Sequence, residues 1–314
     1  MRLHLDTDIG GDVDDLCALT MVLGWPGVEI TGITTVADEG GRRAGYARRA
    51  LELGGHRDVP VAAGVDVASG RFPYPLGLPP EEEYWGGRVA PSPGPVERAV
   101  DLLRASIGLG AVVVGVGPYS NLAELEARYP GSLAAARLVL MGGHVLPPRA
   151  GFPPWGAGED FNVQVDVTAA ETVLARGTPT LVPLSVTVET ALRRAHLPAL
   201  RRAGALGALL ARQAEAQARD ERTEERWGRP YPGLPDDTLV FLHDPLACAV
   251  ALGWRRGVRV DTLPLAWERR DGRLHMRVHD GGRRLPVVVG VDGTAFGSKW
   301  LRCVRRLSEA HPRP

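Results

Sequence analysis

The sequence is poor in cysteine and almost devoid of lysine: three cysteines and a single lysine, Lys299, occur among its 314 residues. Cys17, Cys248 and Cys303 are too few and too far apart for a disulfide framework or a cysteine zinc site. Cys17 and Cys248 stand in apolar helical contexts, so we expect buried thiols rather than nucleophiles. Because the one lysine lies near the end of the chain, several lysine-dependent chemistries are excluded.

Net charge and long apolar runs are also absent. The 37 basic residues are balanced by 37 acidic ones, which argues against a nucleic-acid partner because such partners normally require a basic face. No segment approaches the roughly 18 consecutive apolar residues of a membrane span, and the first residues lack the apolar stretch of a signal peptide. We therefore expect a cytoplasmic protein with no membrane partner.

Short apolar runs alternate with helical patterns through most of the chain. Strands are predicted at 3–8, 28–36, 110–117 and 136–143, and helices at 14–25, 41–53, 96–107 and 120–129. Near-continuous apolar strands that alternate with helices are typical of a parallel sheet covered on both faces. The sequence therefore predicts an α/β fold with a mostly parallel central sheet flanked by helices, an open Rossmann-like sheet. Ligands of such folds bind beyond the carboxyl ends of the strands.

The whole chain, residues 1–314, is predicted to form one domain with two irregular elaborations. The Pro/Gly-rich stretch near 66–95 has the length of a functional loop, and a second irregular stretch lies near 225–237, after a helical region at 198–226. The C-terminal third contains a predicted hairpin at 263–280, whose Asp-Gly dipeptide suits a tight turn.

The strongest chemical signal is the segment DTDIGGDVDD at the end of the first predicted strand. It places five carboxylates within ten residues: Asp6, Asp8, Asp12, Asp14 and Asp15. Carboxylates crowded at a strand end that faces a cleft repel one another and require a cation. All candidate ligands are hard oxygens without a nearby histidine or cysteine, which favours calcium or magnesium over zinc. The alternative is a solvated turn and helix cap, which leaves Asp6 and Asp8 unexplained.

Two other metal motifs fit this segment less well. An EF-hand loop counted from Asp6 needs a glutamate at its twelfth position, where the chain has Cys17, and it follows a helix rather than a strand. A metal-dependent phosphatase that resembles haloacid dehalogenases needs a lysine between its aspartate segment and a later acidic motif. Lys299 lies too near the end of the chain for that role.

The segment DTDIGGDVDD, followed by LCAL, resembles the opening motif of the inosine–uridine-preferring nucleoside hydrolase family. The form found here is two residues longer, between the second aspartate and the aspartate pair, than the usual motif. Further segments resemble the family in order along the chain: GITTVADE (32–39), VGVGPYSNLAEL (114–125), LVLMGG (138–143), EDFNVQVDVTAAETVL (159–174) and HDPLACAV (243–250). The resemblance therefore covers nearly the whole length.

This resemblance implies a Ca²⁺ site and two catalytic residues. By the family pattern, calcium is bound by Asp8, Asp15, the backbone carbonyl of Val116 and Asp244, and Asp8 is also the base that activates a water. A backbone ligand explains why the side chain of Val116 can be apolar. His243 would face the leaving base.

The resemblance also implies a clamp for ribose. Asp14, Glu39, Asp160 and Asn162 would hold the sugar hydroxyls, and Met141 would lie against the sugar. Glu39 replaces an asparagine that is common in the family, and Asp160 replaces a longer glutamate. A clamp of this kind predicts discrimination against deoxyribose, because buried polar groups would lose their partners.

The segments that would meet the base depart furthest from the family pattern. Trp85, in EYWGG, stands where members often carry a histidine, and a tryptophan can stack on a planar base but cannot donate a proton of suitable pKa. The stretch WGRPYPGLP is either a lid, with Trp227, Arg229 and Tyr231 touching the base, or an ordinary surface loop. Asp166 is interpreted as a helix N-cap.

Together these features predict calcium-dependent hydrolysis of the N-glycosidic bond of a ribonucleoside, giving ribose and a free base. The reaction passes through an oxocarbenium-like sugar, so it needs an activated water and help for the departing base. One alternative is a homologue that binds calcium and a nucleoside without turnover, or that acts on another N-riboside. A metal-dependent phosphatase is a further alternative. The resemblance also implies a homo-oligomer, either a dimer or a tetramer.

Overall fold

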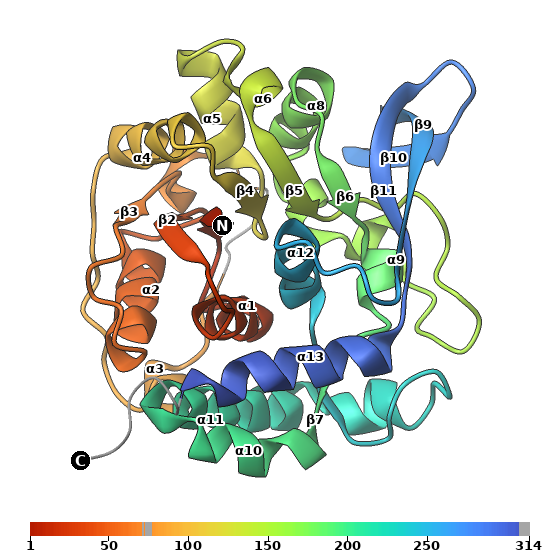
Figure 1. Ribbon diagram of the computed structural model, residues 1–314. Coiled ribbons are helices and arrows are strands. Elements are labelled where there is room, and N and C mark those ends of the chain that lie inside the picture. Colours follow the sequence, from red (N-terminus) through yellow and green to blue (C-terminus); the bar gives the residue numbers. More distant parts are fainter. Residues whose placement is uncertain (71, 73–76, 308–314) are drawn as a thin grey trace.

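A sheet runs through the centre of the molecule in the computed structural model, which describes residues 1–70, 72 and 77–307 (Figure 1). Residues 71, 73–76 and 308–314 lie outside the described residues, and with them part of the predicted loop near 66–95. The strands are β1 (Arg2–Thr7), β2 (Glu29–Thr35), β3 (Val61–Ala63), β4 (Val112–Gly115), β5 (Arg137–Met141), β6 (Thr180–Val182), β7 (Ala191–Arg193), β8 (Thr238–Phe241), β9 (Val258–Arg270), β10 (Arg273–Val278) and β11 (Arg283–Val291).

Within the described residues, nine strands join in the order β10-β9-β11-β6-β5-β4-β1-β2-β3, and β7 pairs with β8. Neighbours from β11 to β3 are parallel, and β9 is antiparallel to β10 and β11. The predicted α/β fold with a mostly parallel sheet is therefore confirmed. The order of the strands reverses at β1, with β2 on one side and β4 on the other. Such a switch point opens a crevice at the carboxyl ends of the strands, which places the site at the ends of β1 and β4.

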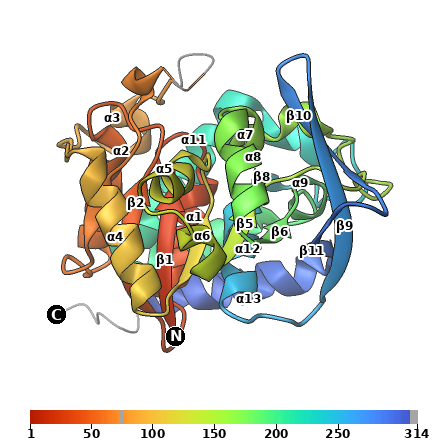
Figure 2. The ribbon, with the colours of Figure 1, turned by 90° about the horizontal axis from the view of Figure 1, so that it is seen from above.

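Helices cover both faces of this sheet (Figures 1 and 2). They are α1 (Asp14–Leu23), α2 (Arg42–Leu53), α3 (Glu81–Tyr84), α4 (Val96–Gly108), α5 (Ser120–Arg128), α6 (Ser132–Ala135), α7 (Phe161–Gln164), α8 (Val167–Arg176), α9 (Leu184–Thr187), α10 (Leu197–Arg202), α11 (Gly204–Glu221), α12 (His243–Ala251) and α13 (Gly293–Arg305). In Figure 1, α4, α5 and α8 lie above the sheet, and α1, α12 and α13 lie below it. The helices α10 and α11 pack against each other as a further layer.

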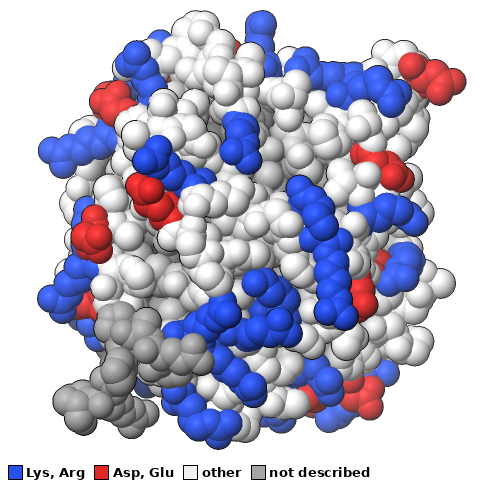
Figure 3. Space-filling view, in the orientation of Figure 1, with Lys and Arg blue, Asp and Glu red and all other residues white. Residues whose placement is uncertain are grey.

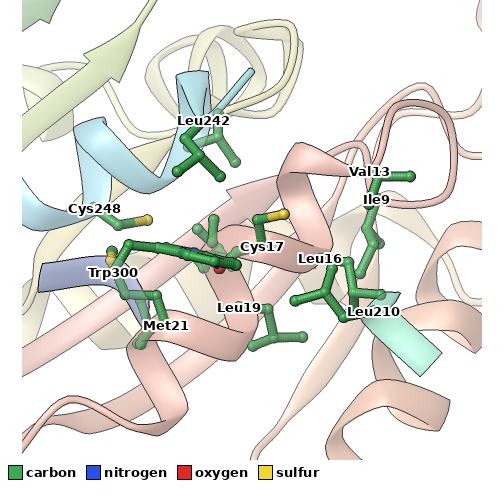
Figure 4. Packing of buried hydrophobic residues seen from close by; sticks show 14 of the residues in the cluster. Ile9, Val13, Leu16, Cys17, Leu19, Met21, Leu210, Leu242, Cys248 and Trp300 are labelled. Carbon is green, nitrogen blue, oxygen red and sulfur yellow. The ribbon is translucent and has the colours of Figure 1, made fainter. Parts of the chain in front are cut away.

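The helices α1, α12 and α13 pack around one tryptophan (Figure 4). Trp300 is fully buried, and its indole Nε1 donates a hydrogen bond of 3.1 Å to the carbonyl of Cys17. Cys17 and Cys248 are free and buried, which confirms the prediction for both thiols. Truncation of a tryptophan buried in this way costs roughly 3–5 kcal/mol of folding free energy. The packing matters for function because it fixes α1 against α12, and both helices carry acidic residues in their first turns.

In the C-terminal hairpin and in the long helical region, residues with positive φ mark the points where a strand or helix ends. The hairpin is present as β9 and β10, and its turn has positive φ at Asp271 (49°) and Gly272 (76°), as a type I′ turn requires. The helical region predicted at 198–226 is divided between α10 and α11, where Gly204 has a φ of 79°. After α11, Arg222 is left-handed, and the π-helical turn Glu224–Gly228 follows.

The surface differs from what the net charge alone implies. On the face shown in Figure 3, Lys and Arg side chains cover more of the surface than Asp and Glu. The cause is that many acidic side chains are buried, among them Asp6, Asp14, Asp15, Asp160 and Asp244. A chain with no net charge therefore has an arginine-rich face. None of the helices in the described part of the chain is long and apolar enough to cross a membrane.

Candidate active site

A cavity of about 820 Å³ opens where the central parallel strands end. Asp8 follows β1, Val116 follows β4 and Met141 is the last residue of β5, and all three line the cavity. Among the described residues, its wall also carries five further carboxyl groups and two guanidinium groups: Asp12, Asp14, Asp15, Glu159, Asp244, Arg43 and Arg226. The cavity thus lies where the strand order predicts it and is strongly acidic.

Three of the carboxylates meet on one wall of the cavity. Asp14 and Asp15 lie in the first turn of α1 and Asp244 in the first turn of α12, and one oxygen of each lies within 4.8 Å of the others. The positive ends of both helix dipoles favour negative charge here. Burial first, and then repulsion from neighbouring carboxylates, nevertheless holds the pKa of all three groups well above the usual range. Such a group is stable only with bound protons or with a cation.

Asp8 faces the same cavity as this carboxylate group. Burial raises the pKa of Asp8 to about 6, although Arg43 opposes the shift. Among the described residues the 4.8 Å group contains Asp14 in place of Asp8. The sequence assigned Asp14 to the sugar, whereas the structure places its carboxylate with Asp15 and Asp244. The predicted metal ligands therefore converge on one cavity, with Asp14 as an additional candidate.

The donor set fits a hard divalent cation. The candidate ligands are carboxylate oxygens and the Val116 carbonyl, and oxygen-only sites of this kind suit calcium or magnesium. The Thr7 hydroxyl donates a hydrogen bond to one oxygen of Asp15, and the backbone N–H of Ile9 donates to Thr7. These bonds hold the Asp15 carboxylate in place. The start of α1 is therefore organised around its acidic residues.

The remaining two aspartates of the motif have other partners. Asp6 is buried beneath the cavity wall, where its Oδ1 accepts hydrogen bonds from the Thr34 hydroxyl (2.6 Å) and from Asn121 Nδ2 (2.7 Å). Asp12 is exposed to the cavity, and its Oδ1 accepts from the Val13 N–H (2.7 Å) and from the Gln217 amide. Asp6 therefore ties β1 to its neighbours, and Asp12 ties the acidic loop to α11.

Besides Asp14, two of the residues predicted to contact the sugar line the cavity, whereas Asp160 is buried and does not line it. Met141 and Asn162 are lining residues. Asn162 Nδ2 donates hydrogen bonds to the carbonyls of Val116 (2.7 Å) and Met141 (3.2 Å), so its Oδ1 is left as an acceptor. Asp160 is buried, accepts a bond of 2.6 Å from the Gly143 N–H and caps α7. Burial raises the pKa of Asp160 to about 7.

Glu39 and Trp85 are not brought to this cavity. The Glu39 side chain is 62% exposed and forms an ion pair of 3.3 Å with Arg42. Trp85 is buried, stacks on Tyr46 at a centroid distance of 4.4 Å and lines a separate surface hollow. The neighbouring Asp38 is buried instead, and its carboxylate accepts hydrogen bonds from the backbone N–H groups of Arg43 (2.8 Å) and Ala44 (3.0 Å) at the start of α2.

His243 and two tryptophans form an aromatic wall opposite the strand ends. Trp155 meets Trp227 edge to face at 5.0 Å and lies 5.9 Å from His243. His243 Nδ1 lies 2.7 Å from the Thr187 hydroxyl, which itself donates to the Leu184 carbonyl at 3.3 Å. The contact between Nδ1 and the Thr187 hydroxyl fits either tautomer of the neutral ring. Burial lowers the pKa of His243 to about 3, so the ring is neutral.

Arg43 is a site residue that the sequence did not single out. Its side chain is buried and donates from Nε to the Ala37 carbonyl (2.8 Å) and from Nη1 to the carbonyls of Asp8 and Ile9 (3.3 Å to Ile9). The one available signal was its position in the first turn of a helix, where a basic side chain is electrostatically unfavourable. Trp155 was missed for a different reason, because it lies in an irregular stretch without periodicity.

The sequence matches the family described as "Inosine-uridine preferring nucleoside hydrolase" over residues 3–298. The chain belongs to this family. Membership confirms the predicted family and the prediction of a hydrolase that acts on N-glycosyl compounds.

Relatives and solved structures agree with this assignment. The chain is 28% identical over 261 residues to the pyrimidine-specific ribonucleoside hydrolase RihA of Salmonella paratyphi A. The aligned residues make up 80% of this chain and 79% of that protein. An uncharacterized protein of Schizosaccharomyces pombe, C1683.06c, is 29% identical over 60% of this chain, and the match spans only 62% of its length. The purine-preferring ribonucleoside hydrolase from Gardnerella vaginalis has the same fold, with a TM-score of 0.78 and 24% identity over 99% of this chain and 100% of that one.

Proposed function

We propose that this nucleoside hydrolase family member cleaves the N-glycosidic bond of ribonucleosides and depends on calcium for this reaction. The observation that carries the proposal is the meeting of Asp14, Asp15 and Asp244 within 4.8 Å on the wall of a cavity at the strand ends. These carboxylates, with Asp8 and the Val116 carbonyl, would hold the ion. When bound, calcium supplies positive charge that lowers the pKa of a nearby water.

Asp8 is the proposed general base. It stands at the end of β1 on the cavity wall, beside the carboxylates that would hold the ion and the water. In the proposed step, Asp8 accepts a proton from water while the water oxygen bonds to C1′. The bond from C1′ to the base nitrogen breaks, its electron pair leaves with the base, and the base takes up a proton from solvent water.

The sugar would lie between the acidic wall and Asn162. The Oδ1 of Asn162 remains an acceptor because its amide group already donates to Val116 and Met141. Asn162 therefore both fixes the Val116 carbonyl and offers an acceptor to a sugar hydroxyl. Asp160, which caps the helix that carries Asn162, is assigned to positioning, whereas Glu39 lies outside the clamp.

The leaving base would lie against the aromatic wall. Trp155, Trp227 and His243 all line the cavity, and flat aromatic surfaces suit a planar base. Burial lowers the pKa of His243 to about 3, so the neutral ring is a weak proton donor toward the departing base. We retain His243 as a residue that faces the leaving group, and its substitution by alanine tests whether it contributes to the departure.

One assay tests the proposal. The purified chain, stripped with a chelator, is incubated with inosine, uridine, cytidine, guanosine or nicotinamide riboside, and reducing sugar is measured before and after calcium is restored. A parallel incubation with nucleoside monophosphates measures the release of phosphate. Release of ribose that requires calcium supports the proposal. Binding of a nucleoside without release of ribose supports the non-catalytic alternative, and release of phosphate from nucleotides supports phosphatase chemistry. The predicted dimer or tetramer is tested separately by the mass of the particle in solution.

A further inference from the structure

A smaller cavity of about 150 Å³ adjoins the main one on the side of the aromatic wall. The two cavities share five lining residues: Asp12, Trp155, Arg226, Trp227 and His243. Beyond them the small cavity is lined by apolar residues of β8 and, at its other end, by polar side chains of α11 and the turn that follows. At roughly 30 Å³ per water molecule, it has room for a few waters or for part of a planar ring. We refer to it as the side cavity.

Asp12 reaches the side cavity because the acidic motif is two residues longer than the usual one. The additional residues form a loop between Asp8 and the start of α1. Gly10 makes this loop possible, because its φ is 105° and a Cβ at this position would lie only 2.3 Å from a ring carbon of Tyr46. The loop then meets α11, where the Val13 N–H donates to Gln217 Oε1 at 2.9 Å. The extra length therefore places a further carboxylate on the wall that the two cavities share, hydrogen-bonded to α11.

The side-chain amide of Gln217 binds one oxygen atom of each of two carboxyl groups. Its Nε2 donates hydrogen bonds to Asp12 Oδ1 and to Glu221 Oε1, the latter at 3.1 Å. Within the described residues, no hydrogen bond or ion pair involves the second oxygen of Asp12 or of Glu221, and both side chains are exposed to solvent. The side cavity therefore presents two carboxyl groups oriented by Gln217, with the Arg226 side chain on the same wall.

Thr223 adds an independent sign that a ligand belongs there. It lines the side cavity, and its hydroxyl is buried without a hydrogen-bond partner among the described residues. Buried hydroxyls are nearly always bonded to protein or water, so a partnerless one indicates a missing polar group. A hydroxyl can donate or accept, and it complements a ring edge that carries both kinds of group.

We infer that the side cavity receives the amino-bearing edge of the leaving base, and that the longer acidic motif thereby directs the enzyme toward bases that present N–H donors. This inference rests on the proposed function. Guanine offers adjacent N1–H and amino donors, and cytosine offers an amino group. Uracil presents a carbonyl oxygen where cytosine has that amino group, and hypoxanthine lacks the amino group of guanine. An acceptor facing Asp12 and Glu221 is unpaired and repelled.

Two substrate pairs that differ in this group test the inference. The wild-type chain is expected to have a kcat/KM for guanosine above that for inosine, and for cytidine above that for uridine, by roughly 10-fold or more, the effect of one charge-assisted hydrogen bond. Glu221→Gln and Asp12→Asn should reduce kcat/KM for the amino member of each pair at least several-fold more than for the other member. Glu215→Gln is the matched control, because Glu215 lies on the same helix but pairs with Arg201 away from both cavities.

The outcome that overturns the inference is equal treatment of both members of each pair, or an equal loss on all substrates in both variants. A structural defect of the acidic loop in Asp12→Asn would lower activity on all substrates alike. Glu221 lies outside this loop, so Glu221→Gln tests the side cavity without that defect. If the wild type hydrolyses none of these nucleosides, the proposed function fails. Calorimetric binding of free cytosine against free uracil then still tests the side cavity, since a preference for cytosine that Glu221→Gln removes does not require turnover.

Discussion

The two ends of the cavity are built in different ways. The acidic end consists of residues at strand ends and in the first turns of helices, where α1 and α12 are fixed by packing around Trp300. The aromatic end consists of Trp155 in an irregular stretch and Trp227 in a π-helical turn, held mainly by ring contacts. The acidic end has the rigidity that chemistry requires, whereas the aromatic end is made of elements that tolerate change. This division predicts large effects on turnover at one end and moderate effects on base binding at the other.

The largest effect is expected from Asp8→Ala. If Asp8 is the base, its loss should lower kcat by roughly 10²–10⁴-fold, the usual contribution of general base catalysis. The measurement is the steady-state rate of ribose release with calcium in excess, together with a circular dichroism spectrum to show that the fold is retained. Asp58→Ala, at an exposed position remote from the cavity, serves as the control. Retention of wild-type kcat in Asp8→Ala would show that the base lies elsewhere.

Calcium should stabilise the protein strongly through the same end of the cavity. Burial, together with repulsion from neighbouring carboxylates, raises the pKa of Asp14, Asp15 and Asp244, so their charged forms are unfavourable without a cation. A ligand at 1,000 times its dissociation constant adds about 4 kcal/mol to the free energy of unfolding, and the Tm should rise by several degrees. Asp244→Asn should raise the Tm of the chelated protein and abolish most of the increase with calcium. A Tm that calcium leaves unchanged in the wild type would count against the metal site.

The stability of the metal-free protein should fall as the pH rises from about 6.5 to 8. Burial raises the pKa of Asp6 and of Asp160 to about 7, far above that of an unfolded aspartate, about 3.9. The fold therefore favours the protonated forms, and their stabilisation is lost as the pH passes through 7. His4 and His243, whose pKa values burial lowers to about 3, give the opposite slope only below about pH 6.5, where an unfolded histidine is protonated.

Urea unfolding of the chelated protein at several pH values measures this slope. Asp160→Asn should flatten it, because the amide does not ionise, whereas Asp58→Asn should leave it unchanged. A free energy of unfolding that increases between pH 6.5 and 8 would contradict the assigned pKa direction.

The contrast between the acidic end and the aromatic end of the cavity also explains which features could be predicted from the sequence. The parallel sheet follows from apolar runs such as Val112–Gly115, which are buried on both faces, and the acidic end follows from a motif within one strand-to-helix segment. Asp166 caps α8 through a bond to the Ala169 N–H, as predicted. These features depend on neighbours in the chain, which is why local pattern is sufficient.

Features that depend on residues far apart in the sequence were missed or misplaced. Gln217 meets Asp12 from 205 residues away, and no periodicity in either segment indicates that contact. Glu39 was assigned to the sugar by position in a motif, whereas in the structure its side chain pairs with Arg42 and the neighbouring Asp38 accepts the hydrogen bonds from the start of α2. The sequence identifies a residue's place along the chain, whereas the direction of its side chain depends on which neighbour binds it.

A moderate effect is expected at the aromatic end. Trp227→Ala should raise KM for nucleosides by roughly 2- to 10-fold with little change in kcat, since one aromatic contact contributes about 0.5–1.5 kcal/mol. Trp25→Ala is a matched control, because Trp25 lies under Lys299 rather than on the cavity wall. A loss of kcat comparable to that of Asp8→Ala would mean that the two ends are coupled and that the contrast between them is false.

The smallest effect is expected from Glu39→Gln. The side chain is 62% exposed, pairs with Arg42 on the surface and does not line the cavity, and an exposed ion pair contributes at most about 1 kcal/mol. Both kcat and KM should therefore stay within about 2-fold of the wild-type values, the scatter that a change below 0.5 kcal/mol allows. Measurements with a ribonucleoside and its 3′-deoxy analogue make the test sharper. If Glu39 held a sugar hydroxyl after a closure of the loop, Glu39→Gln would selectively reduce activity on the ribonucleoside, and the boundary of the acidic end would have to include this loop.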